Sequence, residues 1–466
     1  MDVSAQSIPT DPVGFERWCE DARIRTVVAG SADTHAQWIG KRMPVSDFLR
    51  LLLGEGVAFS DVFFTLTRCG TDVVEPPNPN QHGYFPSKEV GYPDVFFRAD
   101  LTSARVLSWH EGTVAVNGSF VQPDGSPTPI APRNILAEQV SRAGAHDLDV
   151  QVGFEFEFYL FEGVLADLEA NDYRLRPLAT RPYTYSVFRS SIDDELLLDW
   201  RAALEAAGVH IESLAPETGP GQYELNTRYV EAMRAGDDAF LYKHSLKELA
   251  TARGMMASFM AKPGRELPGS SCHLHQSLWS HATGEPILPG GAPGELSQTG
   301  RHYLGGLIDT MTELTALFWP TVNSYKRPTP YSWGATTATW GLDNRSVAVR
   351  MVGSEPGQQR LEHRMGGADV NPYILIAACI AGGLYGIEHE IEPPDPVLHD
   401  AYADTSLPRL PRTLSDALDR LESSAVARKC FGDDFVDHYL AMKRWEVSEY
   451  HDEVSDWEIR HYIETA

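Results

Sequence analysis

The stretch Val152–Glu162 reads V-G-F-E-F-E-F-Y-L-F-E and sets two glutamates two residues apart in an aromatic and aliphatic run. Side chains alternate across a β-strand, so Glu155 and Glu157 share one face while the neighbouring phenylalanines share the other. Two adjacent carboxylates repel each other unless one is protonated or a cation lies between them. The stretch therefore predicts a strand that is either an edge strand with one wet face or the wall of a cation site.

The composition is that of a globular protein. The chain has 466 residues, of which 42% are hydrophobic and 22% charged, and this length suits a large catalytic domain with a smaller companion. The formal net charge of −26 argues against a nucleic-acid partner, because phosphate backbones are bound by basic surfaces. The longest apolar run, residues 374–385, is too short to span a bilayer. We expect no nucleic-acid partner and no membrane partner.

The N-terminus and the cysteines indicate a compartment. The first residues carry neither a basic flank nor an apolar core, so they do not have the pattern of a secretory signal. The five cysteines are spaced singly, which predicts free thiols in a reducing environment. We therefore expect a cytoplasmic protein.

Two proline-rich breaks divide the chain. Before residue 120, the β-like runs T-V-V-A-G, D-V-F-F-T-L and D-V-F-F-R-A-D-L accompany one predicted helix, Val45–Leu53. A loop is predicted at residues 75–86, and a second break follows at 122–129. We predict a small β-rich N-terminal domain over residues 1–120 and a large C-terminal domain over 121–466.

The C-terminal domain alternates predicted strands and helices. The predicted strands are 150–161, 273–278 and 347–352, and the predicted helices are 134–143, 237–260 and 371–388. Strands followed by helices in this order favour an α+β fold with an antiparallel sheet.

Three further segments carry metal-binding side chain types. P-E-T-G-P-G-Q-Y-E-L-N places two glutamates around a turn, C-H-L-H places two histidines on one strand face, and R-L-E-H-R places a glutamate between two arginines. Each alone has an ordinary explanation as turn, polar face or salt bridge. Together, the five glutamates and two histidines are a plausible ligand set for Mg²⁺ or Mn²⁺.

Arginines are concentrated in one part of this acidic chain. Five lie within about forty residues, in the segments N-S-Y-K-R, N-R-S-V-A-V-R and R-L-E-H-R, and guanidinium groups bind phosphates and carboxylates bidentately. Carboxylate-held metals with clustered arginines are typical of phosphoryl transfer. A P-loop is excluded, because the sequence has no Walker-type Gly-rich loop followed by Lys-Ser/Thr.

These segments, in this order, resemble the glutamine synthetase family, as do N-P-Y after residue 370 and L-P-R-L-P-R further on. The resemblance implies a small β-grasp-like N-terminal domain and a large catalytic domain with a curved antiparallel sheet. It also implies an ATP-dependent ligase that activates the γ-carboxylate of L-glutamate as γ-glutamyl phosphate, which an amine then attacks. Family likeness further implies two or three Mg²⁺ or Mn²⁺ ions per site and a homo-dodecamer of two hexameric rings.

The resemblance also implies residue roles. One metal would be held by Glu157, Glu217 and Glu224, and the other by Glu155, His273 and Glu362. ATP would be bound by His275, Ser277, Arg345 and Arg360, and the transferring phosphoryl group neutralised by Arg345, Arg350 and Arg360. Glutamate would be bound by Gly269, Arg327 and Arg364.

Two features that serve ammonia in the family are missing. The D-G-S-S stretch has no counterpart, although Asp61 lies in the nearest region, and the glutamate expected six residues after Arg327 is replaced by Trp333. An indole in place of a carboxylate makes an ammonium site apolar, where buried alkyl or aryl surface gains about 25 cal/mol per Å². We predict an organic primary amine as acceptor (an alkylamine, ethanolamine or an aromatic amine) and a γ-glutamyl amide as product.

Three alternatives stay open. A shifted loop register would leave an ordinary glutamine synthetase that uses ammonium. A γ-glutamylpolyamine synthetase fits less well, because additional ammonium groups favour carboxylates and a cation–π contact offsets only part of that. A non-catalytic relative fits least, because the metal-binding and arginine residue types are all retained.

Overall fold

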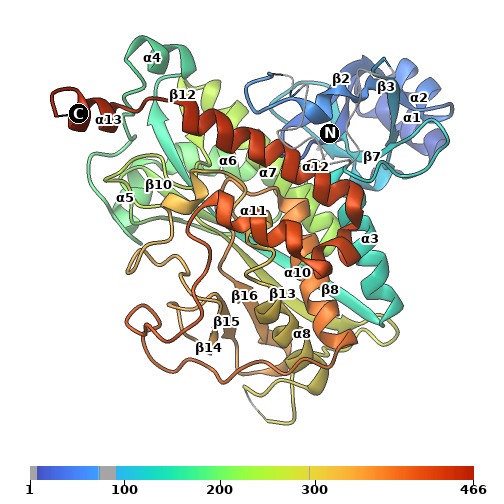
Figure 1. Cartoon of the computed structure of the whole chain (residues 1–466). Coiled ribbons are helices and arrows are strands. Elements are labelled where there is room, and N and C mark those ends of the chain that lie inside the picture. Colours follow the sequence, from blue (N-terminus) through green and yellow to red (C-terminus); the bar gives the residue numbers. More distant parts are fainter. Residues whose placement is uncertain (1–7, 72, 74–90, 293, 466) are drawn as a thin grey trace.

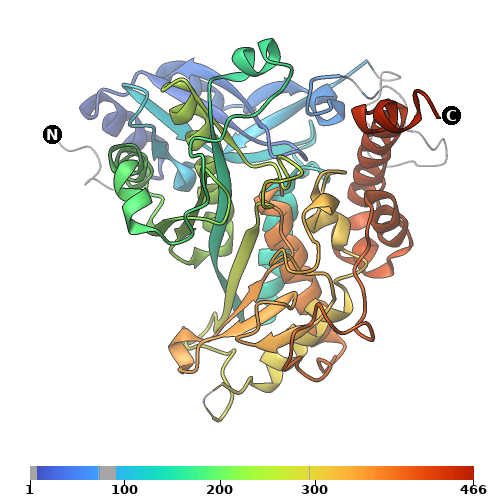
Figure 2. The ribbon, with the colours of Figure 1, turned by 90° about the vertical axis from the view of Figure 1, so that its left-hand side faces the viewer.

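Two hydrophobic cores organise the chain in the computed structural model, which describes residues 8–71, 73, 91–292 and 294–465. The smaller core gathers buried residues between Phe15 and Ala131, and the larger one gathers most of those that follow. In both ribbon views the N-terminal unit (blue) lies at one end of the large unit, and β14–β16 (orange) lie at the opposite end (Figures 1 and 2).

The N-terminal unit contains two small sheets, ordered β2-β1-β6-β5 and β3-β4-β7. Within the first sheet, β1 pairs antiparallel with β2 and parallel with β6. The elements of this unit are α1 (Pro12–Asp21), β1 (Thr26–Ala32), β2 (Trp38–Pro44), α2 (Val45–Leu52), β3 (Val57–Ser60), η2 (Asp61–Thr65), β4 (Asp94–Ala99), η4 (Leu101–Ser103), β5 (Arg105–Val106), β6 (Thr113–Val116) and β7 (Gly118–Val121).

One of the β-like runs predicted in this unit is wrong. D-V-F-F-T-L forms the 3-10 helix η2 after the short strand β3. The successive residues Phe63 and Phe64 are both buried, with ring centroids 4.0 Å apart, whereas a strand would send them to opposite faces. The loop predicted at residues 75–86 lies outside the described residues, and the domain boundary at residue 120 stays a prediction.

The large unit is built on a nine-stranded sheet with the order β14-β15-β16-β13-β8-β10-β9, to which β11 and β12 add by pairing with β8. Its pairs are antiparallel except β14 with β15, which are parallel, so the predicted antiparallel sheet is mixed at one edge. Its strands are β8 (Leu148–Glu162), β9 (Ile211–Pro216), β10 (Gln222–Thr227), β11 (Val230–Glu231), β12 (Met255–Ser258), β13 (Cys272–Ser280), β14 (Trp340–Leu342), β15 (Val349–Val352) and β16 (Arg360–His363).

The helices of the large unit surround this sheet. They are α3 (Pro132–Ala145), α4 (Leu165–Ala170), α5 (Val187–Ile192), α6 (Asp194–Ala206), α7 (Ala232–Thr251), α8 (Gln298–Asp309), α9 (Thr315–Phe318), α10 (Pro372–Glu388), α11 (Leu414–Ser423), α12 (Ala425–Asp452) and α13 (Asp456–Tyr462), with 3-10 turns η5 (Ser324–Lys326) and η6 (Pro356–Gln358). The described part of the chain contains no helix long and apolar enough to cross a membrane.

The predicted α+β class is confirmed, and most predicted elements appear within two residues of their predicted bounds. Besides the D-V-F-F-T-L run, the helix predicted over residues 237–260 departs from this agreement. It begins at Ala232, because the Glu231 side chain caps the N–H groups of Met233 and Arg234. It ends at Thr251, and Gly254 at φ +69° turns the chain into β12.

Strand β8 answers the question raised by its sequence. Phe154, Phe156 and Phe158 are fully buried on one face, where Tyr242 of α7 lies with its ring centroid 5.3 Å from that of Phe156. Helices α3 and α7 both contact β8, and α10 packs against them. The glutamates take the opposite, partly open face, so β8 is a central strand with one apolar and one acidic side.

Candidate active site

Strand register brings the acidic residues together. The antiparallel pairing of β8 with β10 places Glu157 beside Glu224, and its pairing with β13 places Glu155 beside His273. On the next pair, β13 with β16, His275 lies beside Glu362. Four neighbouring strands therefore bring these side chains to the same region of the sheet.

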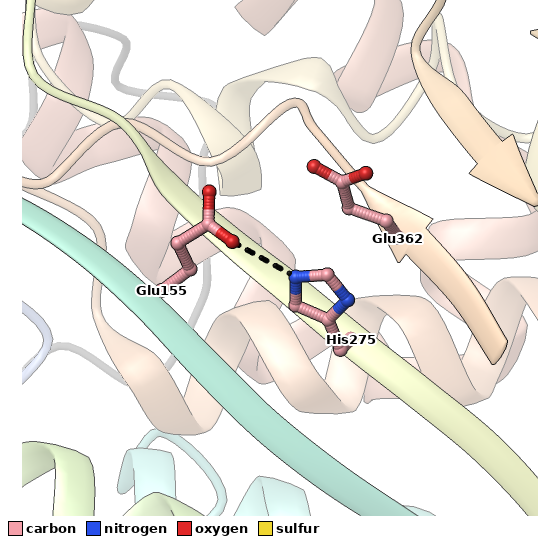
Figure 3. A group of neighbouring side chains, drawn as sticks. All are labelled: Glu155, His275 and Glu362. Carbon is pink, nitrogen blue, oxygen red and sulfur yellow. Dashed lines mark hydrogen bonds and ion pairs between the residues drawn. The ribbon is translucent and has the colours of Figure 1, made fainter. Parts of the chain in front are cut away.

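The first cluster surrounds Glu155. Its Oε1 lies 2.8 Å from His273 Nδ1 and its Oε2 lies 3.1 Å from His275 Nε2. Glu155, His275 and Glu362 each offer one possible ligand atom, and these three atoms lie within 4.8 Å of one another. Figure 3 shows the hydrogen bond between Glu155 and His275, which lie on the adjacent strands β8 and β13. His273 Nδ1 is also 3.4 Å from Glu362 Oε1. Both histidines therefore lie at the first cluster, His273 between Glu155 and Glu362 and His275 against Glu155.

The protonation states of this first cluster suit a cation. Burial, followed by the charge of Arg364, lowers the pKa of His273, which keeps the imidazole neutral. Burial works against ionisation of Glu362, but Arg364 and His273 lower its pKa below the ordinary value. His273 Nε2 is buried and has no hydrogen-bond partner among the described residues. A neutral histidine beside ionised carboxylates is the ligand state that a divalent metal requires.

The second cluster holds Glu157, Glu217 and Glu224. Burial and the charge of Glu217 raise the pKa of Glu157 to about 8, and burial with the charges of Glu155 and Glu217 raises that of Glu224. Burial also raises the pKa of Glu217. Three carboxylates that resist ionisation together fit a divalent cation, which would remove their mutual repulsion.

Three arginines surround the first cluster. Arg350 donates from Nη1 to Glu362 Oε2 at 3.0 Å, and Arg360 Nε donates to His275 Nδ1 at 3.1 Å. Arg364 pairs with Glu362 and donates from Nη2 to the carbonyl of Trp333 at 3.2 Å. Arg360 on β16 therefore holds His275, while Arg364, just after this strand, holds Glu362.

Arg327 is more deeply buried than these three arginines. It is 2% exposed and donates to Ser271 Oγ at 3.0 Å and to the Met365 carbonyl at 2.6 Å. Its Nε, like that of Arg364, is buried without a partner in the described ranges. A Cβ at Gly269 would collide with the Arg327 side chain, so glycine is required there for close packing. These unused donors suit an anionic ligand such as a carboxylate.

A cavity of about 500 Å³ adjoins the first cluster. Residues of the five strands β8, β9, β10, β13 and β16 and of two connecting segments line it, among them Glu155, Tyr229, His275, Ser277, Trp279 and Arg360. Ser277 Oγ accepts a hydrogen bond from Trp279 Nε1 at 2.9 Å. The size and the mixed aromatic and charged lining suit a nucleotide.

Two residues of this site were not predicted from the sequence. Gln222 donates from Nε2 to Glu157 Oε2 at 3.2 Å and to the Gly269 carbonyl at 2.9 Å, which joins the second cluster to the Arg327 region. Tyr185, although 70% exposed, lies near enough to the acidic residues for the charges of Glu217 and Glu224 to raise its pKa, after partial burial. Gln222 lies inside a quoted motif, whereas nothing in the sequence around Tyr185 marked it.

Two other predicted residues lie elsewhere. Trp333 is 59% exposed, and its side chain lines a second cavity, of about 550 Å³, together with Arg345. Asp61 is buried in the N-terminal unit, where burial raises its pKa to about 6. Neither residue contributes to the two carboxylate clusters through a hydrogen bond or ion pair of the described chain.

Comparison with known proteins defines the family. The sequence profile described as "Glutamine synthetase, catalytic domain" matches residues 129–462. The chain therefore belongs to the glutamine synthetase family, whose members are ligases. This assignment confirms the resemblance drawn from the motifs.

Several relatives match along nearly the whole chain. A protein named glutamate–isopropylamine ligase, from a Pseudomonas species, is 35% identical over 96% of both chains. A protein named γ-glutamylethanolamide synthetase, from Streptomyces coelicolor, is 37% identical over 98% of this chain and 96% of its own. A solved structure titled "GmaS/ADP complex" superposes with a TM-score of 0.83 at 26% identity, covering 98% of this chain and 100% of that one.

Proposed function

We propose that this protein is an ATP-dependent ligase that joins the γ-carboxylate of L-glutamate to an organic primary amine. The observation that carries the choice of acceptor is Trp333, an exposed indole six residues after Arg327, where the resemblance leads us to expect a glutamate. The names of the two relatives, which refer to isopropylamine and ethanolamide, support an organic acceptor.

The reaction has two steps. A glutamate γ-carboxylate oxygen attacks the terminal phosphorus of ATP, which gives γ-glutamyl phosphate and ADP. The nitrogen of the neutral amine then attacks the γ-carbonyl carbon, the carbon–oxygen bond to phosphate breaks, and phosphate leaves with the electron pair while the nitrogen loses a proton. The product is a γ-glutamyl amide.

The two clusters would hold the metal ions. Glu157, Glu217 and Glu224 would bind one divalent ion, and Glu155 and Glu362 with His273 or His275 would bind the other. Such ions, Mg²⁺ or Mn²⁺, neutralise charge on phosphate oxygens and orient them for transfer. The raised pKa values of Glu157, Glu217 and Glu224 support the first assignment. His273 Nε2, which has no hydrogen-bond partner in the described part of the chain, supports the second.

The remaining roles are assigned to the arginines and to neighbouring groups. Arg350 and Arg360, which flank Glu362 and His275, would stabilise the charge on the transferring phosphoryl group together with Arg345. Arg327 and Arg364 would bind glutamate through their unused donors, beside the backbone at Gly269. His275, Ser277 and Arg360 would contact ATP in the cavity that they line.

Phosphate release tests this function. The purified full-length chain would be supplied with ATP, glutamate and Mg²⁺, and with ammonium, ethanolamine, isopropylamine, putrescine or aniline as acceptor. We expect faster release with an organic amine than with ammonium, and detection of the γ-glutamyl amide by mass. Ammonium as the best acceptor would identify an ordinary glutamine synthetase, and the absence of turnover with every acceptor would favour a non-catalytic relative.

We further propose the homo-dodecamer and the cytoplasmic location. The family supports the first, and the five free cysteines are consistent with the second.

A further inference from the structure

We infer that the cavity beside Trp333 is the acceptor site and that it selects primary monoamines that carry an aromatic ring. This inference rests on the proposed function and specifies its substrate class. We call residues 329–334, which carry Trp333 into this cavity, the flap.

The cavity is large and has aromatic and aliphatic walls. Its volume is about 550 Å³, and its apolar lining consists of Tyr331, Trp333, Leu342, Val397, Leu398 and Tyr402. Pockets of 300–1,000 Å³ hold ligands of drug size, so an amine with three or four carbons would leave much of this volume without contacts. Because unfilled space forfeits dispersion contacts, a ring-bearing amine suits the cavity better.

The flap holds two aromatic residues in an uncommon backbone conformation. Tyr331 and Trp333 have φ values of +65° and +61°, a region that bulky side chains rarely occupy. Their side chains are 69% and 59% exposed, so core packing does not account for this conformation. Ser332 holds the turn by accepting the Thr329 N–H at 3.0 Å. Tyr331 and Trp333 keep this strained backbone conformation while they line an open cavity. This combination indicates that the two side chains bind a ligand there.

Tyr402 lines the cavity and is hydrogen-bonded to the flap. It is 8% exposed, its hydroxyl donates to the Gly334 carbonyl at 3.1 Å, and its ring centroid is 5.4 Å from that of Tyr331. Burial raises the pKa of this hydroxyl, and the charges of Arg364 and Arg327 partly oppose the rise. Tyr402 therefore lies within electrostatic reach of both arginines assigned to glutamate.

The flap is also joined directly to the glutamate site. Arg364 donates to the Trp333 carbonyl at 3.2 Å, and Arg345, assigned to the phosphoryl group, lines the cavity itself. An amine held against the three rings would thus lie next to the groups that hold the activated glutamyl chain.

The charges of the cavity disfavour a second ammonium group. Of its two lining carboxylates, Asp343 is neutralised by its pair with Arg350. The other, Asp400, accepts the Tyr402 N–H at 2.9 Å, and its charge is offset by the guanidinium of Arg345 in the same lining. The guanidinium of Arg345 would repel an additional positive charge. A monoamine meets neither obstacle, so the cavity discriminates against diamines.

The experiment measures the KM of three amines at saturating glutamate and ATP with the full-length enzyme. We expect benzylamine to have a KM about tenfold lower than isopropylamine, and putrescine the highest. The Tyr331→Ala variant should raise the KM for benzylamine about tenfold and that for isopropylamine less than twofold, with the KM for glutamate unchanged. Tyr402→Phe, which keeps the ring and removes the hydroxyl, should reduce this preference by loosening the flap.

Tyr173→Ala is the matched control. Tyr173 is 65% exposed, has a φ of +55° and does not line the cavity, so this variant should keep wild-type constants and report any general cost of such a change. Variants are compared only where their melting temperatures match that of the control.

Three results would overturn the inference while leaving the proposed ligase intact. One is a lower KM for isopropylamine or putrescine than for benzylamine. Another is a Tyr331→Ala variant with unchanged amine constants. The third is a smaller assembly for Tyr331→Ala in sedimentation, which would make the aromatic pair a subunit contact. If the wild-type enzyme turned over none of the three amines, the proposed function itself would be refuted.

Discussion

At the scale of single residues, Glu157 is a buried carboxylate that lies next to other carboxylates and is repelled by them. Its carboxylate accepts the Ser271 N–H at 2.8 Å and the Gln222 amide, yet burial and Glu217 still raise its pKa to about 8. The local hydrogen bonds favour the ionised form, but they do not outweigh desolvation and like charge. A bound divalent cation would remove the repulsion among these carboxylates. The site should therefore favour a doubly charged ion over a singly charged one.

The metal-free protein should lose stability as the pH rises. Because the folded-state pKa of Glu157 is above its ordinary value of 4.5, the native state holds a proton between pH 4.5 and 8 that the unfolded state has released. Urea unfolding in EDTA should show a falling free energy of unfolding over this window. Saturating Mg²⁺ should abolish the fall, and Glu157→Gln should weaken it. Glu162→Gln, at the exposed end of the same strand, is the control, and a rise with pH in EDTA would contradict the prediction.

Trp333 is the residue at which acceptor choice should be most easily changed. Trp333→Glu would place a carboxylate where an ammonium ion can be attracted, so the ratio of kcat/KM for ammonium to that for an organic amine should rise at least tenfold. The KM values for glutamate and ATP should hold within about twofold, because Trp333 lines the second cavity and not the one lined by Glu155, His275 and Arg360. Initial rates of phosphate release measure both, and an unchanged amine ratio would remove Trp333 from the acceptor site.

At the scale of elements, β8 supports the site from behind. Its phenylalanine face packs under α7, with the rings of Phe154 and Phe156 stacked at 5.1 Å, while its acidic face meets β10 and β13. The strand therefore transmits any loss of core packing to Glu155 and Glu157, which adjoin Phe156 in the sequence.

Phe156→Ala should remove the central ring of this packing. Phe156 is fully buried, and replacing such a ring by alanine costs about 3–5 kcal/mol of unfolding free energy. Urea denaturation measures the loss. Phe188→Ala is the matched control, because Phe188 is 71% exposed and should change stability by less than about 0.5 kcal/mol. Similar losses in both variants would argue against the role given to the β8 face.

At the scale of the whole molecule, a buried polar network joins the two units. Arg133 of α3 donates to both oxygens of Asp237 on α7 at 2.9 Å and reaches Asp100 of the N-terminal unit at 2.7 Å. Asn117, also from the N-terminal unit, donates to Asp237 at 2.9 Å. The network therefore ties the orientation of the small unit to the helices under the central sheet.

Asp237→Ala should loosen this junction. Without Asp237, the buried Arg133 keeps only Asp100, whose side chain is 34% exposed, as an anionic partner among the described residues. Breaking a buried ion pair costs about 3–5 kcal/mol, and urea unfolding should show a loss of at most this size. The double variant Arg133→Met/Asp237→Leu, which removes both charges, should recover most of the stability. Hydrogen exchange should show faster opening of β7 and α3 in the single variant than in the double one. If the single and double variants had equal free energies of unfolding, the charge left on Arg133 in the single variant would not be what destabilises it.

The assembly is the second prediction at this scale. If the proposed dodecamer forms, sedimentation should give twelve times the 51.6-kDa mass of one chain. A monomer that turns over amines would contradict the assembly and leave the chemistry intact.

Much of this protein is encoded locally. The alternation of phenylalanine and glutamate in β8, the capping Asn371 of α10 and the amphipathic run of α2 are properties of neighbouring residues, and the elements appear where these patterns predict them. The residue types of the two clusters were likewise recognisable, because metal and phosphate chemistry require carboxylates, histidines and arginines. Their roles in catalysis stay predictions.

Contacts between distant segments were decided by the tertiary structure alone. Phe63 and Phe64 are both buried in the core, and the segment that carries them forms a 3-10 helix instead of the predicted strand. Strand register places both histidines, His273 and His275, against Glu155. Tyr402 and Tyr331 lie about seventy positions apart in the sequence and meet because the flap folds back on a loop. A local pattern specifies the face on which a side chain lies, but register and packing determine which other side chain it meets.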